Sequence, residues 1–255
     1  MSLRVAVTGA CGQMGREVVA AAAERDAEVV LAVNRAPSAD EVHGVPVEPS
    51  GDLSVLLEER DPDVLVDFTG PASSVAYVAE CVEAGVPAVV GTTGFSGAQE
   101  RRLREASERV PLLRAANFSR GIQALRRAVR EAVRTLPGYD VELTETHHNR
   151  KRDAPSGTAK EILDDVEAEL DREERVHGRE GEAPRTEREV GVHARRAGDV
   201  TGEHEVLLAD NHEVLTLTHR AESRGVFAAG ALDAAEWLAD RNPGYYEFAD
   251  AIGER

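Results

Sequence analysis

The first 120 residues alternate short apolar runs, rich in β-branched residues, with longer alanine-rich or amphipathic stretches. This alternation is typical of βαβ units and predicts a parallel sheet with helices on its faces. The expected strands lie at 4–8, 29–33, 64–68, 88–90 and 112–115, and the expected helices at 13–24, 73–84 and 96–109. Gly85 is placed to end the second of these helices as its C-cap. Residues 1–120 are therefore expected to form a doubly wound α/β domain.

The pattern changes after a further expected helix at 122–136. Strands are expected at 140–147, 190–196, 203–209 and 213–220, and one charged helix at 159–175. The short turn Asp210-Asn211-His212 joins the last two strands. Residues 178–188 are rich in Gly, Glu, Arg and Pro, without apolar periodicity, and predict a mobile loop. We expect a smaller α+β domain with a mixed sheet over 121–220, while 221–255 pack back onto the first domain.

A glycine-rich turn lies between the first expected strand and the first expected helix. Its residues, Gly9, Ala10, Cys11, Gly12, Gln13, Met14 and Gly15, fit the spacing G-x-x-G-x-x-G. The first glycine allows a tight turn, the second lets the backbone approach a pyrophosphate, and the third permits close packing of helix on strand. The helix N-terminus then directs its free N–H groups at the phosphates. Glycine-rich turns also occur for structural reasons alone, but this position favours dinucleotide binding by a Rossmann-type domain.

The end of the second expected strand bears on which dinucleotide is bound. An acidic residue usually binds the adenosine ribose there and repels a 2′-phosphate, but this chain has Asn34 and Arg35. An amide can hydrogen-bond a hydroxyl without repelling phosphate, and a guanidinium can bind phosphate directly. Arg35 could equally be a solvated loop cation. We expect NADPH to be preferred and NADH to be accepted.

The densest group of polar side chains lies between residues 142 and 159. His147 and His148 are followed by Lys151 and then by a turn that enters a helix. Burying such a group for stability alone would be costly, which favours a functional site. Hydroxyls and free N–H groups at 155–158, where the helix begins, suit a carboxylate. The alternatives are that Ser156 only caps the helix and that the basic residues are only solvated.

Composition excludes several classes of partner. The formal net charge of −17 argues against nucleic acid and against an anionic membrane. No apolar run approaches the roughly 18 residues of a membrane span, and the N-terminus has no export-signal pattern. The cysteines Cys11 and Cys81 are too few for a disulfide framework and lack zinc-site spacing. We expect a soluble cytoplasmic protein without a metal site.

All but two of the 30 basic residues are arginines, the exceptions being Lys151 and Lys160. One interpretation is a GC-rich genome that encodes arginine in place of lysine. The other is an acidic surface suited to concentrated salt, because salt screens the repulsion between surface charges. The sequence leaves both interpretations open.

Five blocks of the sequence together resemble the dihydrodipicolinate reductase family. They are Gly9 to Gly15, the Gly-Thr-Thr-Gly at 91–94, the Asn-Phe-Ser at 117–119, the block Glu-Thr-His-His-Asn-Arg-Lys-Arg-Asp-Ala-Pro-Ser-Gly-Thr-Ala at 145–159, and Arg-Ala-Gly-Asp at 196–199 with Gly-Glu-His at 202–204. The blocks follow the family's order and span most of the chain. The block at 145–159 is the most specific of them.

The resemblance implies an NAD(P)H-dependent reductase of diaminopimelate-pathway lysine biosynthesis, which converts 4-hydroxy-tetrahydrodipicolinate to tetrahydrodipicolinate. By the same resemblance, His147 is the acid/base residue and Lys151 a catalytic cation in the second, substrate-binding domain. The residues that hold the carboxylates of this small cyclic substrate are His148, Ser156, Gly157 and Thr158. Histidine suits proton delivery because its side chain titrates near neutral pH.

The resemblance also implies the residues that line the cofactor and the assembly of the protein. The cofactor residues are Gly9, Ala10, Cys11, Gly12, Gln13, Met14, Gly91, Thr92, Thr93, Ala116, Asn117, Phe118 and Ser119. Family members are commonly homotetramers formed through the sheet of the substrate domain. The chain departs from the family at Cys11, Asn34 and Arg120, which bears on cofactor preference. Neither an aspartate-type dehydrogenase nor a nucleotide sensor without turnover would need the double-histidine block.

Overall fold

The computed structural model describes residues 2–170 and 174–253. Contacts divide the chain into two compact units, one formed by the residues up to Phe118 together with those from Arg224 onward, the other by Ser119–Ser223. The α/β fold class expected from the sequence is confirmed, because one unit holds a largely parallel sheet between helices and the other a mixed sheet.

The first unit contains the following elements: β1 (Leu3–Thr8), α1 (Gln13–Ala23), β2 (Ala27–Asn34), β3 (Glu41–Val42), β4 (Val45–Pro49), α2 (Leu53–Arg60), β5 (Val64–Asp67), α3 (Pro71–Ala84), β6 (Ala88–Val90), α4 (Gly97–Ser107), β7 (Pro111–Arg114), α7 (Gly225–Leu238), β13 (Gly244–Tyr246) and α8 (Phe248–Gly253). The sheet order is β13-β7-β6-β5-β1-β2-β4-β3. All neighbouring strands pair in parallel except β3 and β4, which form an antiparallel hairpin.

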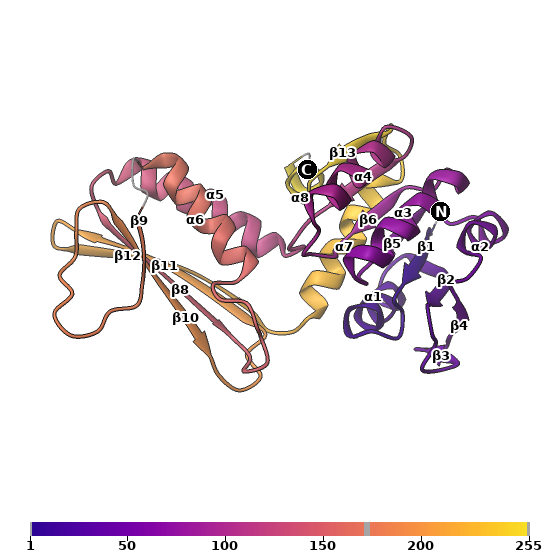
Figure 1. Cartoon of the computed structure of the whole chain (residues 1–255), viewed down its shortest axis with the longest axis horizontal. Helices are drawn as coiled ribbons and strands as arrows, with labels where there is room; N and C mark the ends of the chain where they lie inside the picture. Colours follow the sequence, from indigo (N-terminus) through magenta and orange to yellow (C-terminus); the bar gives the residue numbers. More distant parts are fainter. Residues whose placement is uncertain (1, 171–173, 254–255) are drawn as a thin grey trace. The chain divides into compact units, whose positions relative to one another are not determined.

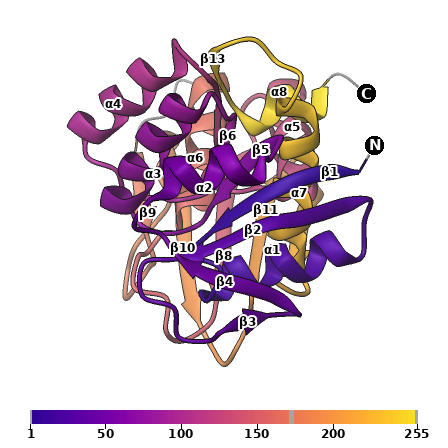
Figure 2. The same cartoon turned by 90° about the vertical axis from the view of Figure 1, so that its right-hand side faces the viewer.

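Helices cover both faces of this sheet (Figure 2). One apolar core joins α1, α7 and α8 to one face, and a second joins α2, α3 and α4 to the other. Strands buried on both faces are apolar throughout, and β5 and β6 have no exposed residue. Gly85 ends α3 with a φ of 72°, as the sequence predicted. Ser96 caps α4 in a capping box with Gln99.

Six elements of the first unit were not predicted from the sequence: β3, β4, α2, α7, β13 and α8. The hairpin strand β4 contains Pro46 and Pro49, which a sheet tolerates near its edge but which obscure a strand pattern. The helix α2 has Val55 half exposed and lacks a clear apolar stripe. The helix α7 is alanine-rich and buried along most of its length, so its few polar residues give only a weak helical period.

The second unit contains α5 (Arg120–Thr135), β8 (Asp140–His147), α6 (Gly157–Glu169), β9 (Glu174–His177), β10 (Glu189–Arg196), β11 (Gly202–Asp210) and β12 (Glu213–Ala221). Its sheet order is β12-β11-β8-β10-β9. The strands β8, β9 and β10 run in parallel, and β11 is antiparallel to β8 and to β12. Both helices pack on the same face of the sheet, around one apolar core (Figure 1).

One expectation for this unit requires correction. The helix expected at 159–175 ends at Glu169, and Arg175 lies in β9, where it pairs with β10. Residues 171–173 lie outside the described residues. The segment 178–188 has no helix or strand, as expected, and its Arg185 donates to the carbonyl oxygens of Val141 (3.1 Å) and Glu189 (2.9 Å).

The turn between β11 and β12 has the expected tight form. Asn211 and His212 have φ angles of 48° and 64°, as a two-residue hairpin turn of the I′ kind requires. The N–H of Asn211 donates to the Asp210 carboxylate at 2.7 Å. This turn sets the register that aligns β11 with β12.

Candidate active site

The predicted cofactor residues of the first unit gather at one edge of its sheet. Because β1, β2, β5, β6 and β7 run in parallel, their carboxyl ends share this edge. The residues that follow these strands are Gly9 to Met14 after β1, Asn34 and Arg35 at the end of β2, Gly91, Thr92 and Thr93 after β6, and Ala116, Asn117 and Phe118 after β7. Ligands of open α/β sheets bind at this edge, where the strand order reverses.

The glycine turn after β1 has the geometry of a dinucleotide loop. Gly9 has a φ of 69°, and a Cβ at Gly15 would lie 2.2 Å from the Gly9 carbonyl oxygen, so α1 approaches β1 more closely than a side chain allows. The N–H of Ala10 donates to the Val33 carbonyl oxygen at 3.1 Å, which ties the turn to β2. Gly12 is the N-cap of α1 and offers no side chain to its N–H groups. These residues fit a bound pyrophosphate.

At the end of β2, the Asn34 side chain bonds to its own loop, whereas the Arg35 side chain is open to solvent. The side-chain amide of Asn34 donates to the Ala36 carbonyl oxygen at 2.8 Å, so it holds its own loop. Arg35 is exposed. Burial would raise the pKa of the Cys11 thiol, but hydrogen bonds with Ser38 and Ala39 lower it below its usual value. The same loop therefore reaches the glycine turn.

A fully buried carboxylate, Asp67, lies at the end of β5 and shapes the neighbouring loops. Four hydroxyls donate to it: Thr8 (2.7 Å), Thr69 (2.6 Å), Thr92 (2.9 Å) and Ser74. Thr92, a predicted cofactor residue, thus directs its hydroxyl inward and holds the 91–93 turn in place. Sequence reasoning did not single out Asp67; its signal was an acidic residue at the end of the apolar run Val-Leu-Val.

The boundary between the two units falls between Phe118 and Ser119, two neighbouring residues of the predicted cofactor set. The Phe118 ring is buried between Phe68 and Phe248, at centroid distances of 5.7 Å and 5.2 Å, so it belongs to the core of the first unit. Ser119 opens the second unit and caps α5, accepting from the N–H of Ile122 at 3.3 Å. Its Oγ also lies 3.2 Å from His219 Nε2.

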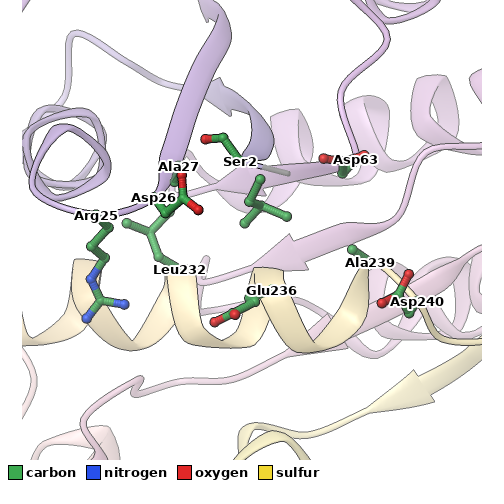
Figure 3. A pocket seen from close by; sticks show the side chains of 10 residues that line it. Ser2, Arg25, Asp26, Ala27, Asp63, Leu232, Glu236, Ala239 and Asp240 are labelled. Carbon is green, nitrogen blue, oxygen red and sulfur yellow. The ribbon is translucent and has the colours of Figure 1, made fainter.

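A pocket of about 710 Å³ lies at the opposite edge of the same sheet (Figure 3). Leu3 and Ala27, which begin β1 and β2, line it. Figure 3 shows the carboxylates of Asp26, Glu236 and Asp240 around it. A pocket of this charge at the amino ends of the strands does not suit an anionic dinucleotide.

The polar centre of the second unit is built around Glu145. On β8, Val141, Leu143 and Glu145 point to the core in turn, and Glu145 is fully buried. The register of β8 with β10 brings Arg196 beside it, and this guanidinium donates to both carboxylate oxygens, at 2.7 Å and 2.8 Å. His147 Nδ1 lies 2.6 Å from Oε2 of Glu145, and the N–H of Ser156 donates to Oε1 at 3.1 Å.

The partners of Glu145 determine its charge. Burial alone would raise the pKa of this carboxyl, but the hydrogen bonds and charges of His147 and Arg196 lower it to about 2. Glu145 is therefore ionised near neutral pH. It joins His147, on β8, to the turn that enters α6.

A second histidine, His204, faces this group from β11. Its ring meets that of His147 edge to face at 5.3 Å, and its Nε2 lies 3.1 Å from Ser156 Oγ. Burial, together with the charge of His147, lowers the pKa of His204 to about 3. His204 is therefore neutral near pH 7.

The predicted substrate residues surround the N-terminus of α6. Ser156 is its N-cap, accepting from the N–H of Ala159 at 3.1 Å; Thr158 is buried and Gly157 is exposed on the first turn. Lys151 Nζ lies 2.9 Å from Asp153 Oδ1, and its charge also acts on His204. His148 is half-buried and directly follows β8.

The structure thus brings His147, Ser156 and Lys151 into one polar group, and adds Glu145, Arg196 and His204. Glu145, Arg196 and His204 belong to the blocks that resemble the family, but the sequence alone indicates no role for them. A signal was present for two of them, because Glu145 and His204 occupy inward positions of alternating strands where apolar residues are usual. Arg196 gave no comparable signal.

The group can bind anions and move a proton. Cationic and N–H donors lie beside an imidazole that a carboxylate orients. Among residues 2–170 and 174–253, no three His, Cys, Asp or Glu side chains are placed to hold a metal ion. Within the same described ranges, the helices are too short or too polar to cross a membrane.

A Rossmann-type nucleotide unit joined to an α+β unit with this centre defines a two-domain, nicotinamide-nucleotide-dependent reductase. The family models "Dihydrodipicolinate reductase, N-terminus" and "Dihydrodipicolinate reductase, C-terminus" match residues 3–118 and 121–252. The chain therefore belongs to the dihydrodipicolinate reductase family.

Individual relatives agree with this assignment. The chain is 57% identical over 249 residues to the 4-hydroxy-tetrahydrodipicolinate reductase of Haloarcula marismortui, covering 98% of both chains. It is 54% identical to that of Natronomonas pharaonis, covering 98% of this chain and 100% of the relative. The dipicolinate-bound dihydrodipicolinate reductase of Paenisporosarcina sp. TG-14 superposes with a TM-score of 0.80 at 25% identity, covering 99% of this chain and 100% of that one.

Proposed function

We propose that this oxidoreductase reduces the ring of a small cyclic dicarboxylate, converting 4-hydroxy-tetrahydrodipicolinate to tetrahydrodipicolinate in lysine biosynthesis by the diaminopimelate route. The observation that carries the proposal is the Glu145 carboxylate, which joins His147 to the N-terminus of α6. Glu145 thereby fixes the position of a proton donor, His147, relative to a carboxylate-binding helix N-terminus. The reduction of an anionic ring requires both groups. The family membership of the whole chain supports the same reaction.

In this proposal the 4-hydroxyl of the substrate leaves as water, hydride adds to the resulting conjugated ring, and His147 delivers a proton to the carbanion-like centre so formed. Lys151 stabilises the charge that develops on the substrate. His148 and the first turn of α6, Ser156-Gly157-Thr158, hold the substrate carboxylates. Because the chain has a net charge of −17, the local excess of Arg150, Lys151 and Arg152 attracts an anionic substrate to this region.

A nicotinamide dinucleotide bound at the glycine turn supplies the hydride. The N-terminus of α1 and the turn Gly9 to Met14 hold its pyrophosphate, and the segments 91–93 and 116–119 line the rest. Arg35 favours NADPH, because its exposed guanidinium can bind a 2′-phosphate and Asn34 carries no repelling charge. NADH is accepted with lower affinity.

The assembly we propose is a homotetramer formed through the second unit. The face of its sheet opposite α5 and α6 bears Leu207 and Val214, and Val214 is 63% exposed. An apolar residue exposed on an open sheet face favours burial against a second copy. We also assign the enzyme to the cytoplasm, because Cys11 and Cys81 are both free thiols.

The acidic surface we attribute to function in concentrated salt. Each subunit of a tetramer brings 17 net negative charges toward like-charged neighbours. The Debye length is about 30 Å at 0.01 M salt and about 3 Å at 1 M, so salt shortens the range of this repulsion.

One experiment tests these proposals together: oxidation of NADPH and of NADH by the purified enzyme, with the ring substrate, from about 0.05 M to about 2 M KCl. We expect turnover with both nucleotides, a lower KM for NADPH, and activity and melting temperature that rise with salt. Nucleotide binding without oxidation would indicate a sensor and contradict the reductase. A melting temperature that does not change with salt would contradict the brine-adapted surface.

Two variants test the proposed preference for NADPH over NADH. Arg35→Ala should weaken NADPH more than NADH, by roughly the 1.5 to 3 kcal/mol of a hydrogen bond to a charged group. Asn34→Asp should penalise NADPH through like-charge repulsion. Equal effects of each variant on both nucleotides would place the 2′-phosphate elsewhere.

A further inference from the structure

The carboxylate of Glu145 is hydrogen-bonded at both of its oxygens. It is fully buried and accepts from Arg196 at both oxygens, from the backbone N–H of Ser156, and from His147 Nδ1 at 2.6 Å. An ionised carboxylate can only accept hydrogen bonds, so the shared proton in the contact with His147 belongs to Nδ1. The geometry therefore selects one tautomer of His147, with Nε2 as the nitrogen that gains and loses a proton.

The packing around the His147 ring supports this arrangement. Gly202, at the start of β11, has no side chain, and a Cβ there would lie 3.1 Å from His147 Nε2 and 3.4 Å from Cδ2. A side chain there would require the ring to shift by a few tenths of an ångström. Gly202 thus leaves room beside Nε2.

The other titratable and charged groups around His147 come from every neighbouring element. His204 faces it from β11, Arg196 from β10, and the charge of Lys151 acts on the same cluster. Ser156 Oγ accepts from the N–H of Ala159 and lies 3.1 Å from His204 Nε2. This contact engages His204 Nε2 with the N-cap of α6.

We propose that Glu145 is a positioning residue: it holds one proton of His147 on Nδ1, so that Nε2 is the nitrogen that gives its proton to the substrate, and it keeps that nitrogen in register with the carboxylate-binding turn of α6. This inference rests on the proposed function, in which His147 is the proton donor. In the proton-transfer step, the Nε2–H bond of the imidazolium breaks and its proton bonds to the carbanion-like carbon, whose electron pair forms the new C–H bond. The hydride added in the same reaction comes from the reduced nicotinamide. His147 is left neutral with its Nδ1–H on Glu145, and solvent returns the proton to Nε2.

The first test uses the wild-type enzyme. In protein labelled with ¹⁵N-histidine, NMR should show His147 in the Nδ1–H tautomer when neutral, with the resonance assigned by its loss in His147→Ala. The Nε2–H tautomer in the wild type would overturn the proposal, whatever the variants do.

The second test uses Glu145→Gln, with Glu142→Gln as a matched control. Glu142 lies on the same strand, 2.7 Å from His193 Nε2 and paired with Arg185, but on the opposite face. Glu145→Gln should lower kcat at least about tenfold, with the KM for NADPH unchanged. The pH profile of kcat should differ from that of the wild type, because the negative charge beside His147 Nδ1 is lost. Glu142→Gln should leave kcat and its pH profile as in the wild type.

Glu145→Asp and His147→Ala complete the design. Aspartate keeps the charge one methylene further back and should recover part of the lost kcat and the wild-type pH profile, which loss of folding alone would not do. Full activity in Glu145→Gln, or equal pH profiles in Glu145→Gln and the wild type, would overturn the inference. His147→Ala distinguishes failure of the Glu145 inference from failure of the proposed function. Full turnover in that variant would refute the role of His147 as proton donor.

Discussion

Each unit contains a fully buried carboxylate, and the two are held by different chemistry. Asp67, in the first unit, is bound by the hydroxyls of three threonines and a serine. Glu145, in the second, is bound by a guanidinium, an imidazole and a backbone N–H. The contacts around Asp67 join loops at the edge of a sheet, whereas those around Glu145 join groups that can exchange charge.

The kind of hydrogen-bond donor around a buried carboxylate determines what that carboxylate can do. Hydroxyls can turn to donate or accept, so they satisfy a carboxylate without determining the protonation of a neighbour. Arg196 and His147 instead carry or acquire positive charge, and they lower the pKa of Glu145 to about 2 despite its burial. We therefore assign Asp67 a role in shaping the nucleotide loops and Glu145 a role in proton transfer.

Variants at the Glu145 centre and at the Asp67 centre should differ most in turnover. We expect Lys151→Ala and His147→Ala each to lower turnover at least about a hundredfold while NADPH affinity stays nearly intact, because in the proposed function both residues act on the transition state and both belong to the second unit. Thr92→Ala, beside Asp67, should instead raise the KM for NADPH more than it lowers turnover. Steady-state kinetics and nucleotide titration distinguish these effects. Loss of nucleotide affinity in the Lys151 or His147 variants would show that the site is misplaced.

The second largest effect should be that of Glu145 on the free energy of unfolding, and it should depend on pH. Because the folded pKa of Glu145 lies near 2, below its usual 4.5, its contribution is fully present above pH 4.5 and is lost as pH falls toward 2. Glu145→Gln should therefore destabilise the fold by about 2 to 3 kcal/mol at neutral pH. Urea unfolding across this range should show the difference from the wild type shrinking with acid. A difference that does not depend on pH would contradict the assigned charge of Glu145.

His204 should give a smaller effect in a higher pH range. Its folded pKa of about 3 lies below its usual 6.5, so between these values the unfolded chain binds the proton more readily than the folded one. Stability should fall as pH drops below 6.5, by up to about 2 kcal/mol from this residue by pH 5. His204→Gln keeps an acceptor for Ser156 and should flatten that slope. An unchanged slope in unfolding experiments at pH 7 and pH 5 would mean that His204 is charged in the folded protein.

The smallest effect should come from Asp67. In Asp67→Asn the side-chain oxygen still accepts from hydroxyls, and one of them can rotate to accept from the new amide. We expect a loss of about 1 kcal/mol in the free energy of unfolding, smaller than for Glu145→Gln. Asp67→Ala, which leaves four hydroxyls without their acceptor, is the control and should cost more. A larger loss in Asp67→Asn than in Glu145→Gln would reverse the comparison between the two centres.

Much of this organisation could be predicted from local sequence patterns. Alternation of period two marked β8, β11 and β12, the glycine spacing marked the turn between β1 and α1, and Gly85 marked the end of α3. The block at 145–159 marked the polar segment around His147. These signals are local because each arises within a single strand, turn or helix.

Other elements had no local signal of that kind. The charged stretch at 159–175 carried a helical pattern to its end, yet Arg175 lies in β9, because pairing with β10 outweighs helix propensity there. The loop at 178–188 had the composition of a mobile segment, and its attachment depends on Arg185 meeting carbonyl oxygens and carboxylates from two other strands.

Patterns along the chain were enough to identify the family, the two kinds of sheet, the glycine turn and the segment that holds His147 and Lys151. The groups that complete the two centres emerged from the packing of separate elements. Arg196 reaches Glu145 because β8 and β10 pair in parallel, and His204 faces His147 because β11 lies on the other side of β8. These partners are 51 and 57 positions apart along the chain. The physical reason is that spacing along the sequence orders side chains only within one element, whereas a buried charge is satisfied by whatever the packing of several elements brings to it.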